Sequence, residues 1–133
     1  MLASDPVSAA VNALADLTEI SAQIETAVVF DREGTVVAST VDDEKAGRLA
    51  AMALELLRAA EEHRDPAHEE AAELVQLDVA LRNGSVFVVR ETDRLIAATT
   101  TPEPTVGLVF YDLKSCLRAL GQEQAGEKDD EGP

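Results

Sequence analysis

Two histidines stand in the most acidic part of the chain, where a divalent metal could bind. His63 and His68 are flanked by glutamates at positions 61, 62, 69 and 70, and imidazole with carboxylate is a ligand set that zinc accepts. Their i, i+5 spacing is interrupted by Pro66, so both rings cannot share one helical face as the i, i+4 pair of a helical zinc site does. We therefore expect a solvated acidic loop there, and no metal or other cofactor.

Cys116 and the acidic turn at Asp31 and Glu33 are the other reactive groups. A nucleophilic thiol needs a nearby base and exposure, whereas Cys116 falls on an apolar helical stripe. The two turn carboxylates have a local reason to be there, because Asp favours turn starts. No phosphate loop (GxxxxGK[ST]), dinucleotide fingerprint (GxGxxG) or nucleophile elbow (GxSxG) occurs. We expect no catalytic residue and no enzyme.

Charge and composition narrow the class of partner. Twenty-six acidic residues against eleven basic ones give a net charge of -15, which disfavours nucleic acid and anionic membranes as partners. No stretch approaches the roughly 20 apolar residues of a membrane span, and the first residues lack the pattern of a secretory signal. With a single cysteine, the simplest expectation is a cytoplasmic protein that binds another protein.

The apolar pattern predicts three helices and five strands in the order αββαβββα. Apolar residues at helical spacing cover residues 6–20, 42–64 and 106–120. Alternating apolar residues and turn residues indicate a hairpin over 26–40 and three strands over 75–101. The first two of these three strands are joined at Asn83 and Gly84. Hairpin-length links require antiparallel pairing. We expect one α+β domain over residues 1–121, with helices on both faces of a five-stranded antiparallel sheet, and a disordered acidic tail over 122–133.

The second helix is unusually apolar for so acidic a chain. Eleven of the fifteen residues in 46–60 are hydrophobic, and at 100° per residue they cover roughly 220°, about twice what one sheet face needs. Either another element of the chain covers the excess or a second copy does, and we expect a homodimer. Its predicted interface comprises Leu49, Met52, Ala53, Leu56, Leu57 and Ala60 of this helix with Val75 and Leu77 of the next strand.

The first hairpin has the form hydrophobic-hydrophobic-x-D-x-x-G-x-hydrophobic-hydrophobic-A-S. It is met by Val28, Val29, Asp31, Gly34, Val36, Val37, Ala38 and Ser39. With the Ala/Leu-rich second helix and the closing "TVGLVFYDLKSCLRAL", this pattern resembles the Roadblock / dynein light chain family over residues 5–120.

The resemblance implies a homodimer in which second helices pair and third strands join into one sheet. It also implies binding of a small Ras-like GTPase, as activator, exchange factor or scaffold. The thin charged stripe of the second helix, Arg48, Glu55, Arg58 and Glu62, is where we expect that partner, and Arg48 or Arg58 could in principle be inserted into its active site.

Two other functions stay open from the sequence. Profilin-like and PAS-like sensors also place helices on a five-stranded antiparallel sheet, although aromatic residues make up only 3% of this chain and ligand pockets are usually lined with them. A purely structural dimerisation module is the other alternative.

Overall fold

The computed structural model describes the backbone of residues 6–63 and 75–131, and the side chains of residues 8–63 and 75–120. The elements are α1 (Pro6–Ile20), β1 (Ile24–Asp31), β2 (Val36–Ser39), α2 (Asp43–Glu62), β3 (Gln76–Leu81), β4 (Gly84–Glu91), β5 (Arg94–Thr100) and α3 (Val106–Glu131). The predicted order αββαβββα is confirmed.

The five strands form one antiparallel sheet in the order β2-β1-β5-β4-β3. Three neighbouring pairs are hairpins, and the fourth pair joins β1 to β5 along almost their whole lengths, from Ile24 opposite Thr100 to Asp31 opposite Arg94. The first hairpin therefore adds to the outer side of the last strand, which leaves β2 and β3 as the two edges. The predicted α+β class and antiparallel sheet are confirmed.

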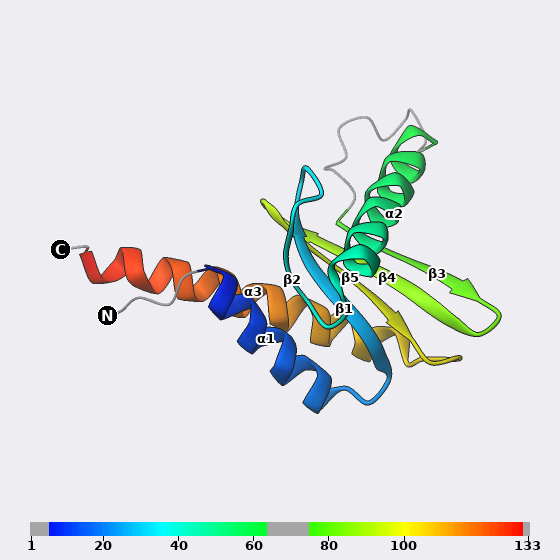
Figure 1. Cartoon of the computed structure of the whole chain (residues 1–133), viewed down its shortest axis with the longest axis horizontal. Helices are drawn as coiled ribbons and strands as arrows, with labels where there is room; N and C mark the ends of the chain where they lie inside the picture. The colour runs from blue at the N-terminus through cyan, green and yellow to red at the C-terminus, as the bar shows by residue number, and fades with distance from the viewer. Residues whose placement is uncertain (1–5, 64–74, 132–133) are drawn as a thin grey trace.

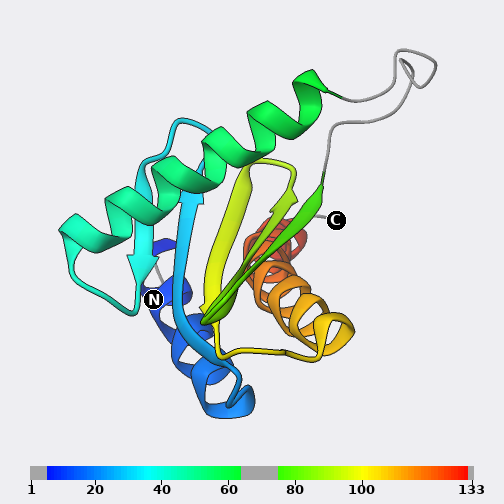
Figure 2. The same cartoon turned by 90° about the vertical axis from the view of Figure 1, so that its right-hand side faces the viewer.

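Helices cover both faces of this sheet, as predicted. Figure 1 and Figure 2 show α1 and α3 side by side on one face and α2 running diagonally across the other. Side chains alternate between faces along each strand, so Val88 of β4 meets α2 and its neighbours Phe87 and Val89 meet α1 and α3. Each layer thus has its own apolar core.

A large apolar residue of α1, Val11, lies outside the core. Ala10, Leu14 and Leu17 are buried, whereas Val11 is 51% exposed. A residue next to Ala10 is turned by about 100° around the helix axis, which carries its side chain away from the sheet. The stripe of α1 is therefore narrower than its apolar sequence indicates.

The turn between β3 and β4 is placed one residue earlier than the sequence predicts. Leu81 pairs directly with Gly84, so Arg82 and Asn83 form the turn and Gly84 opens β4. A Cβ on Gly84 would stand 2.3 Å from the Thr100 carbonyl oxygen. Glycine is required here because the β5 backbone approaches too closely for any side chain.

The last helix is longer than the sequence indicates. We expect it to end near Gly121, whereas helical backbone continues to Glu131, through most of the segment predicted to be disordered. The added residues are mainly Gln, Glu, Ala and Lys, which have high helix propensity, and no proline interrupts them. The division into a domain of residues 1–121 and an acidic tail stays a prediction.

Candidate protein-binding surface

Helix α2 is fixed at its N-terminus by a cap and along one side by the sheet. The Asp42 side chain accepts a hydrogen bond from the Lys45 amide N–H at 2.9 Å, and acidic side chains follow in the first turn, where the helix dipole favours them. The side facing the sheet is a narrow stripe of mostly small residues, which lets the helix backbone lie close to the strands. These buried residues are Ala46, Ala50, Ala53 and Leu57.

Six of the eight residues predicted for a dimer interface keep exposed surface. Ala53 and Leu57 are 0% and 1% exposed; they are already buried against the chain's own sheet and belong to its core. They form the inner part of the 220° apolar arc, which packs on the chain's own sheet. The residues beside them form what we call the apolar flank: Leu49, Leu56 and Ala60, which are half-buried, and Met52, which is 41% exposed.

Strand β3 provides the other predicted interface residues at an edge of the sheet. Val75, just before the strand, is 49% exposed, and Leu81 at its end is 56% exposed. Leu77 is half-buried and packs against the core beneath α2. Within the described residues β3 pairs only with β4, so its outer backbone groups form an edge that another strand can join.

The charged stripe lies on the outer side of α2. Arg48, Glu55, Arg58 and Glu62 are all exposed, as predicted from their angular positions. Arg48 Nη1 lies 3.1 Å from Glu44 Oε2, one helical turn earlier. At 100° per residue most of the apolar flank lies on a different side of the helix from the stripe, and Met52 lies between the two.

A hollow beside the charged stripe joins α2 to the turn between β1 and β2. It has a volume of about 500 Å³, and its lining includes Glu55 and Arg58 of the stripe together with Glu33 and Gly34 of the turn. A Cβ on Gly34, which has φ +90°, would lie 3.3 Å from Leu54 Cδ1. The turn is therefore seated directly against the helix, and its two elements form one surface.

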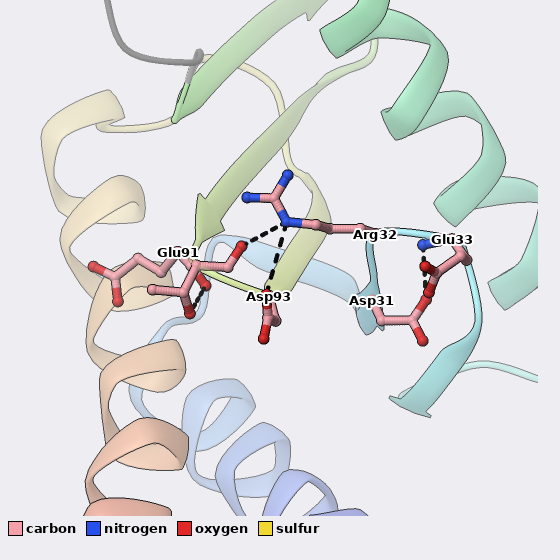
Figure 3. A network of polar contacts seen from close by, with 6 residues as sticks. Asp31, Arg32, Glu33, Glu91 and Asp93 are labelled. Atoms are coloured by element: carbon pink, nitrogen blue, oxygen red, sulfur yellow. Dashed lines mark hydrogen bonds and ion pairs between the residues drawn. The ribbon is translucent and has the colours of Figure 1, made fainter.

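The turn that completes this surface is held rigidly. Asp31 Oδ1 accepts hydrogen bonds from the amide N–H groups of Glu33 at 3.0 Å and Thr35 at 2.9 Å, which fully explains the aspartate at this position. Arg32 extends to the neighbouring turn between β4 and β5, where its Nε donates a hydrogen bond to the Thr92 carbonyl oxygen at 2.9 Å (Figure 3). The same Nε lies 4.0 Å from Asp93 Oδ1. The sequence interpretation missed this contact because the partners are 60 residues apart.

A second missed interaction ties the end of α2 to the sheet. Arg90 of β4 is 8% exposed, and its Nη2 donates to Glu61 Oε2 of the last helical turn at 2.5 Å. A buried guanidinium is stable only with such partners. In the sequence, the only signal is an arginine at the end of the apolar run "VFVVR".

Of the cysteine and histidines that could do chemistry, the structure describes Cys116 and His63. Burial, with the negative charge of Asp16 adding to it, raises the pKa of the Cys116 thiol to about 11, so the thiol is protonated at neutral pH. His63 is exposed, with its Nδ1 3.1 Å from the Ala59 carbonyl oxygen; His68, Glu69 and Glu70 lie outside the described residues.

Neither a metal cluster nor a membrane span is found in the described parts of the chain. Over residues 8–63 and 75–120, no group of three or more His, Cys, Asp and Glu side chains is placed to hold a metal ion. No helix in the part of the chain that the structure describes is long and apolar enough to cross a bilayer.

Comparisons with known proteins agree on one fold. The Roadblock/LC7 domain model matches residues 10–101. A Roadblock/LC7 domain from Streptomyces avermitilis superposes with a TM-score of 0.73 at 17% identity, covering 84% of this chain and 93% of that one. The gliding protein MglB from Thermus thermophilus gives 0.74 at 17% identity, covering 92% and 93%, and Myxococcus xanthus MglB gives 0.75 at 12% identity, covering 95% of each chain. No curated protein matches the sequence.

Proposed function

Because the chain belongs to the Roadblock/LC7 family, we propose that it is a non-enzymatic homodimer that binds a small Ras-like GTPase in the cytoplasm. In this role it regulates or scaffolds the GTPase and modulates its nucleotide cycle. Homodimers and GTPase partners are what the family resemblance implies, and the free surfaces of α2 and β3 are consistent with both.

The dimer is supported by surface that one chain leaves uncovered. The apolar flank of α2 and the open edge of β3 carry the exposed side chains of Met52 and Val75. A two-fold axis beside α2 brings the same flank of each copy together, which is how symmetric dimers bury a self-complementary patch. The proposed interface therefore consists of Leu49, Met52, Leu56, Ala60, Val75 and Leu77.

The observation that carries the GTPase proposal is the hollow beside the charged stripe. It combines Glu55 and Arg58 with an apolar floor at Leu54 and a rigid turn at Gly34. Charged side chains around a shallow concave surface suit reversible protein recognition, since arginine is enriched at binding hot spots. Met52 lines this hollow and also belongs to the proposed dimer interface, whereas Glu55, Arg58 and the turn lie outside that interface and stay available to a partner of the homodimer.

The proposed mechanism works through residues of the partner. In this proposal an effect on hydrolysis or exchange comes from repositioning groups that the GTPase already has. A direct contribution is confined to an inserted arginine, for which exposed Arg48 and Arg58 are the candidates.

Gel filtration with the small Ras-like GTPases of the same genome tests this proposal. We expect a complex in the GDP or the GTP-analogue state, and a changed rate of hydrolysis or nucleotide exchange. Arg58→Glu should weaken the complex about tenfold or more, as loss of an interface arginine does, whereas Glu25→Lys on exposed β1 surface should not. Absence of a complex in both nucleotide states contradicts the proposal.

A further inference from the structure

A groove lies between α1 and α3 on the side of the molecule away from α2. It has a volume of about 370 Å³ and is lined by Ala13, Asp16, Leu17, Ile20, Tyr111, Asp112, Ser115, Cys116 and Ala119. Both helices pack on the same face of the sheet (Figure 1), and the groove is on their outer surface. None of the roles proposed for α2 uses it.

The groove exposes large apolar side chains on the surface of an acidic protein. Leu17 and Cys116 at its base are 4% and 6% exposed, whereas Ile20 and Tyr111 on its rim are 73% and 66% exposed. Apolar surface of this kind, rimmed by polar groups, marks an interaction site rather than ordinary surface. A tyrosine suits such a rim because its ring is apolar and its hydroxyl remains in water.

The charge of the groove is of one sign. Asp16 and Asp112 are among its nine lining residues, and none of the nine is basic. The nearest arginine of α3, Arg118, is engaged elsewhere, with its Nε 3.3 Å from Glu91 Oε2. The field of Asp16 reaches the base of the groove, since it contributes to the raised pKa of Cys116.

We propose that this groove docks a short helical segment of a partner protein that combines an apolar face with Lys or Arg side chains. The apolar face covers Leu17, Ile20 and Tyr111, and the basic side chains pair with Asp16 and Asp112. The lining of α3 from Tyr111 to Ala119 spans roughly 12 Å, the length of two helical turns. The net charge of -15 favours the approach of a basic segment. It disfavours an acidic one, such as this chain's own C-terminal residues.

Synthetic helical peptides test the groove directly on the full-length protein. The probe is a 14-residue peptide with Leu at i, i+3, i+4 and i+7 and Lys at the flanking positions; the control peptide has Glu in place of every Lys. Titration calorimetry should show one site per chain for the Lys peptide and none for the Glu peptide. Amide chemical shifts should change along α1 and α3 and not along α2.

Substitutions in the groove separate specific docking from general attraction to an acidic protein. Ala119 is exposed on the groove wall, so Ala119→Arg should block the groove and abolish the titration without loss of the folded structure. Asp16→Asn with Asp112→Asn should weaken binding about fivefold, the effect of losing two exposed ion pairs. The matched control, Glu25→Gln with Glu103→Gln at two exposed positions outside every proposed site, removes the same charge elsewhere and should leave the affinity unchanged.

Each alternative occupant gives a result that overturns the proposal. If the two control substitutions weaken binding as much as the groove substitutions, the attraction is to the whole charge and there is no docking site. If Ala119→Arg instead abolishes concentration-dependent self-association in sedimentation, the groove is an interface between copies. If a neutral detergent such as a dodecyl maltoside binds there at one per chain and the Lys peptide does not, the groove is a pocket for small amphiphiles.

Discussion

The two faces of the sheet are covered unequally. Two helices close one face, where Phe87, Ile96 and Leu113 are completely buried. A single helix crosses the other, and there Leu49, Leu56 and Leu77 are only partly buried around a smaller core. The sheet side of the closed face is fully covered within one chain, and only the outer surface of α1 and α3 exposes apolar groups there, whereas the open face leaves part of its own core layer uncovered. We therefore expect stability to be determined mainly by the closed face and assembly by the open face.

The largest effect is expected from Phe87→Ala on the closed face. The Phe87 ring is 0% exposed and meets Phe110 edge to face, with ring centroids 4.9 Å apart. Removing a buried phenyl ring costs about 3–5 kcal/mol. Urea unfolding should show this loss at every protein concentration. Val79→Ala on half-buried β3 should cost about 1 kcal/mol or less, and an equal loss at both positions would break the comparison.

The buried ion pair at the end of α2 should give the next largest effect. Glu61→Leu removes the carboxylate that Nη2 of buried Arg90 contacts, and we expect a loss of about 2–3 kcal/mol in the free energy of unfolding. Glu61→Leu with Arg90→Met should restore most of it, because apolar replacements of a buried pair are often neutral. Glu62→Leu, at the exposed neighbouring position, is the matched control and should stay within about 0.5 kcal/mol.

The open face should respond to charge by losing assembly instead of stability. Met52→Glu with Leu56→Glu places carboxylates on the apolar flank, and we expect the dimer dissociation constant to rise about thirtyfold or more, measured by sedimentation equilibrium. The monomer should keep its circular dichroism spectrum. Ala53→Glu, one residue from Met52 but 0% exposed, should unfold the chain. If the double substitution leaves the dissociation constant unchanged, the dimer interface does not lie on α2.

The closed face should also weaken at high pH through Cys116. Its pKa is raised from 9.0 to about 11, so the folded chain holds the thiol proton more tightly than the unfolded chain does. The stabilisation is complete below pH 9 and falls as the pH rises through 11, by about 2 kcal/mol. Chemical denaturation gives the free energy of unfolding of the wild type and of Cys116→Val at pH 8 and at pH 11. The difference between the two proteins should change from pH 8 to pH 11 by the contribution of the thiol. An unchanged difference would show that the thiol is not buried.

The comparison of faces also explains which features could be predicted from the sequence. Element order and type follow from local periodicity and turn residues, so the hairpin at Asp31 and Gly34 was predicted correctly. The width of the apolar arc on α2 also follows from the sequence alone. Periodicity alone, however, does not say which part of an arc the chain covers itself, and Ala53 and Leu57 were assigned to the wrong side for that reason.

The remaining parts of the candidate site depend on contacts between distant segments. The hollow exists because Gly34 packs against Leu54 and because Arg32 is held by Thr92. Each partner has an ordinary local role, as a turn residue or an exposed arginine, so no local pattern marks it. The charged stripe was predictable because all of its members lie on one helix.

The smallest effect on stability is expected from the charged stripe, and it sharpens the comparison most. Arg48 and Glu44 form an exposed i, i+4 pair, and pairs of this kind contribute only about 0.3–0.5 kcal/mol. Arg48→Gln should therefore leave the unfolding curve and the dimer almost unchanged. If α2 is the surface that a GTPase contacts, the same substitution should weaken that complex and reduce the effect of salt on the binding that remains, measured by anisotropy at two ionic strengths. A stability loss above about 1 kcal/mol would show that the outer side of α2 is structural, and the division between a stabilising face and a binding face would then fail.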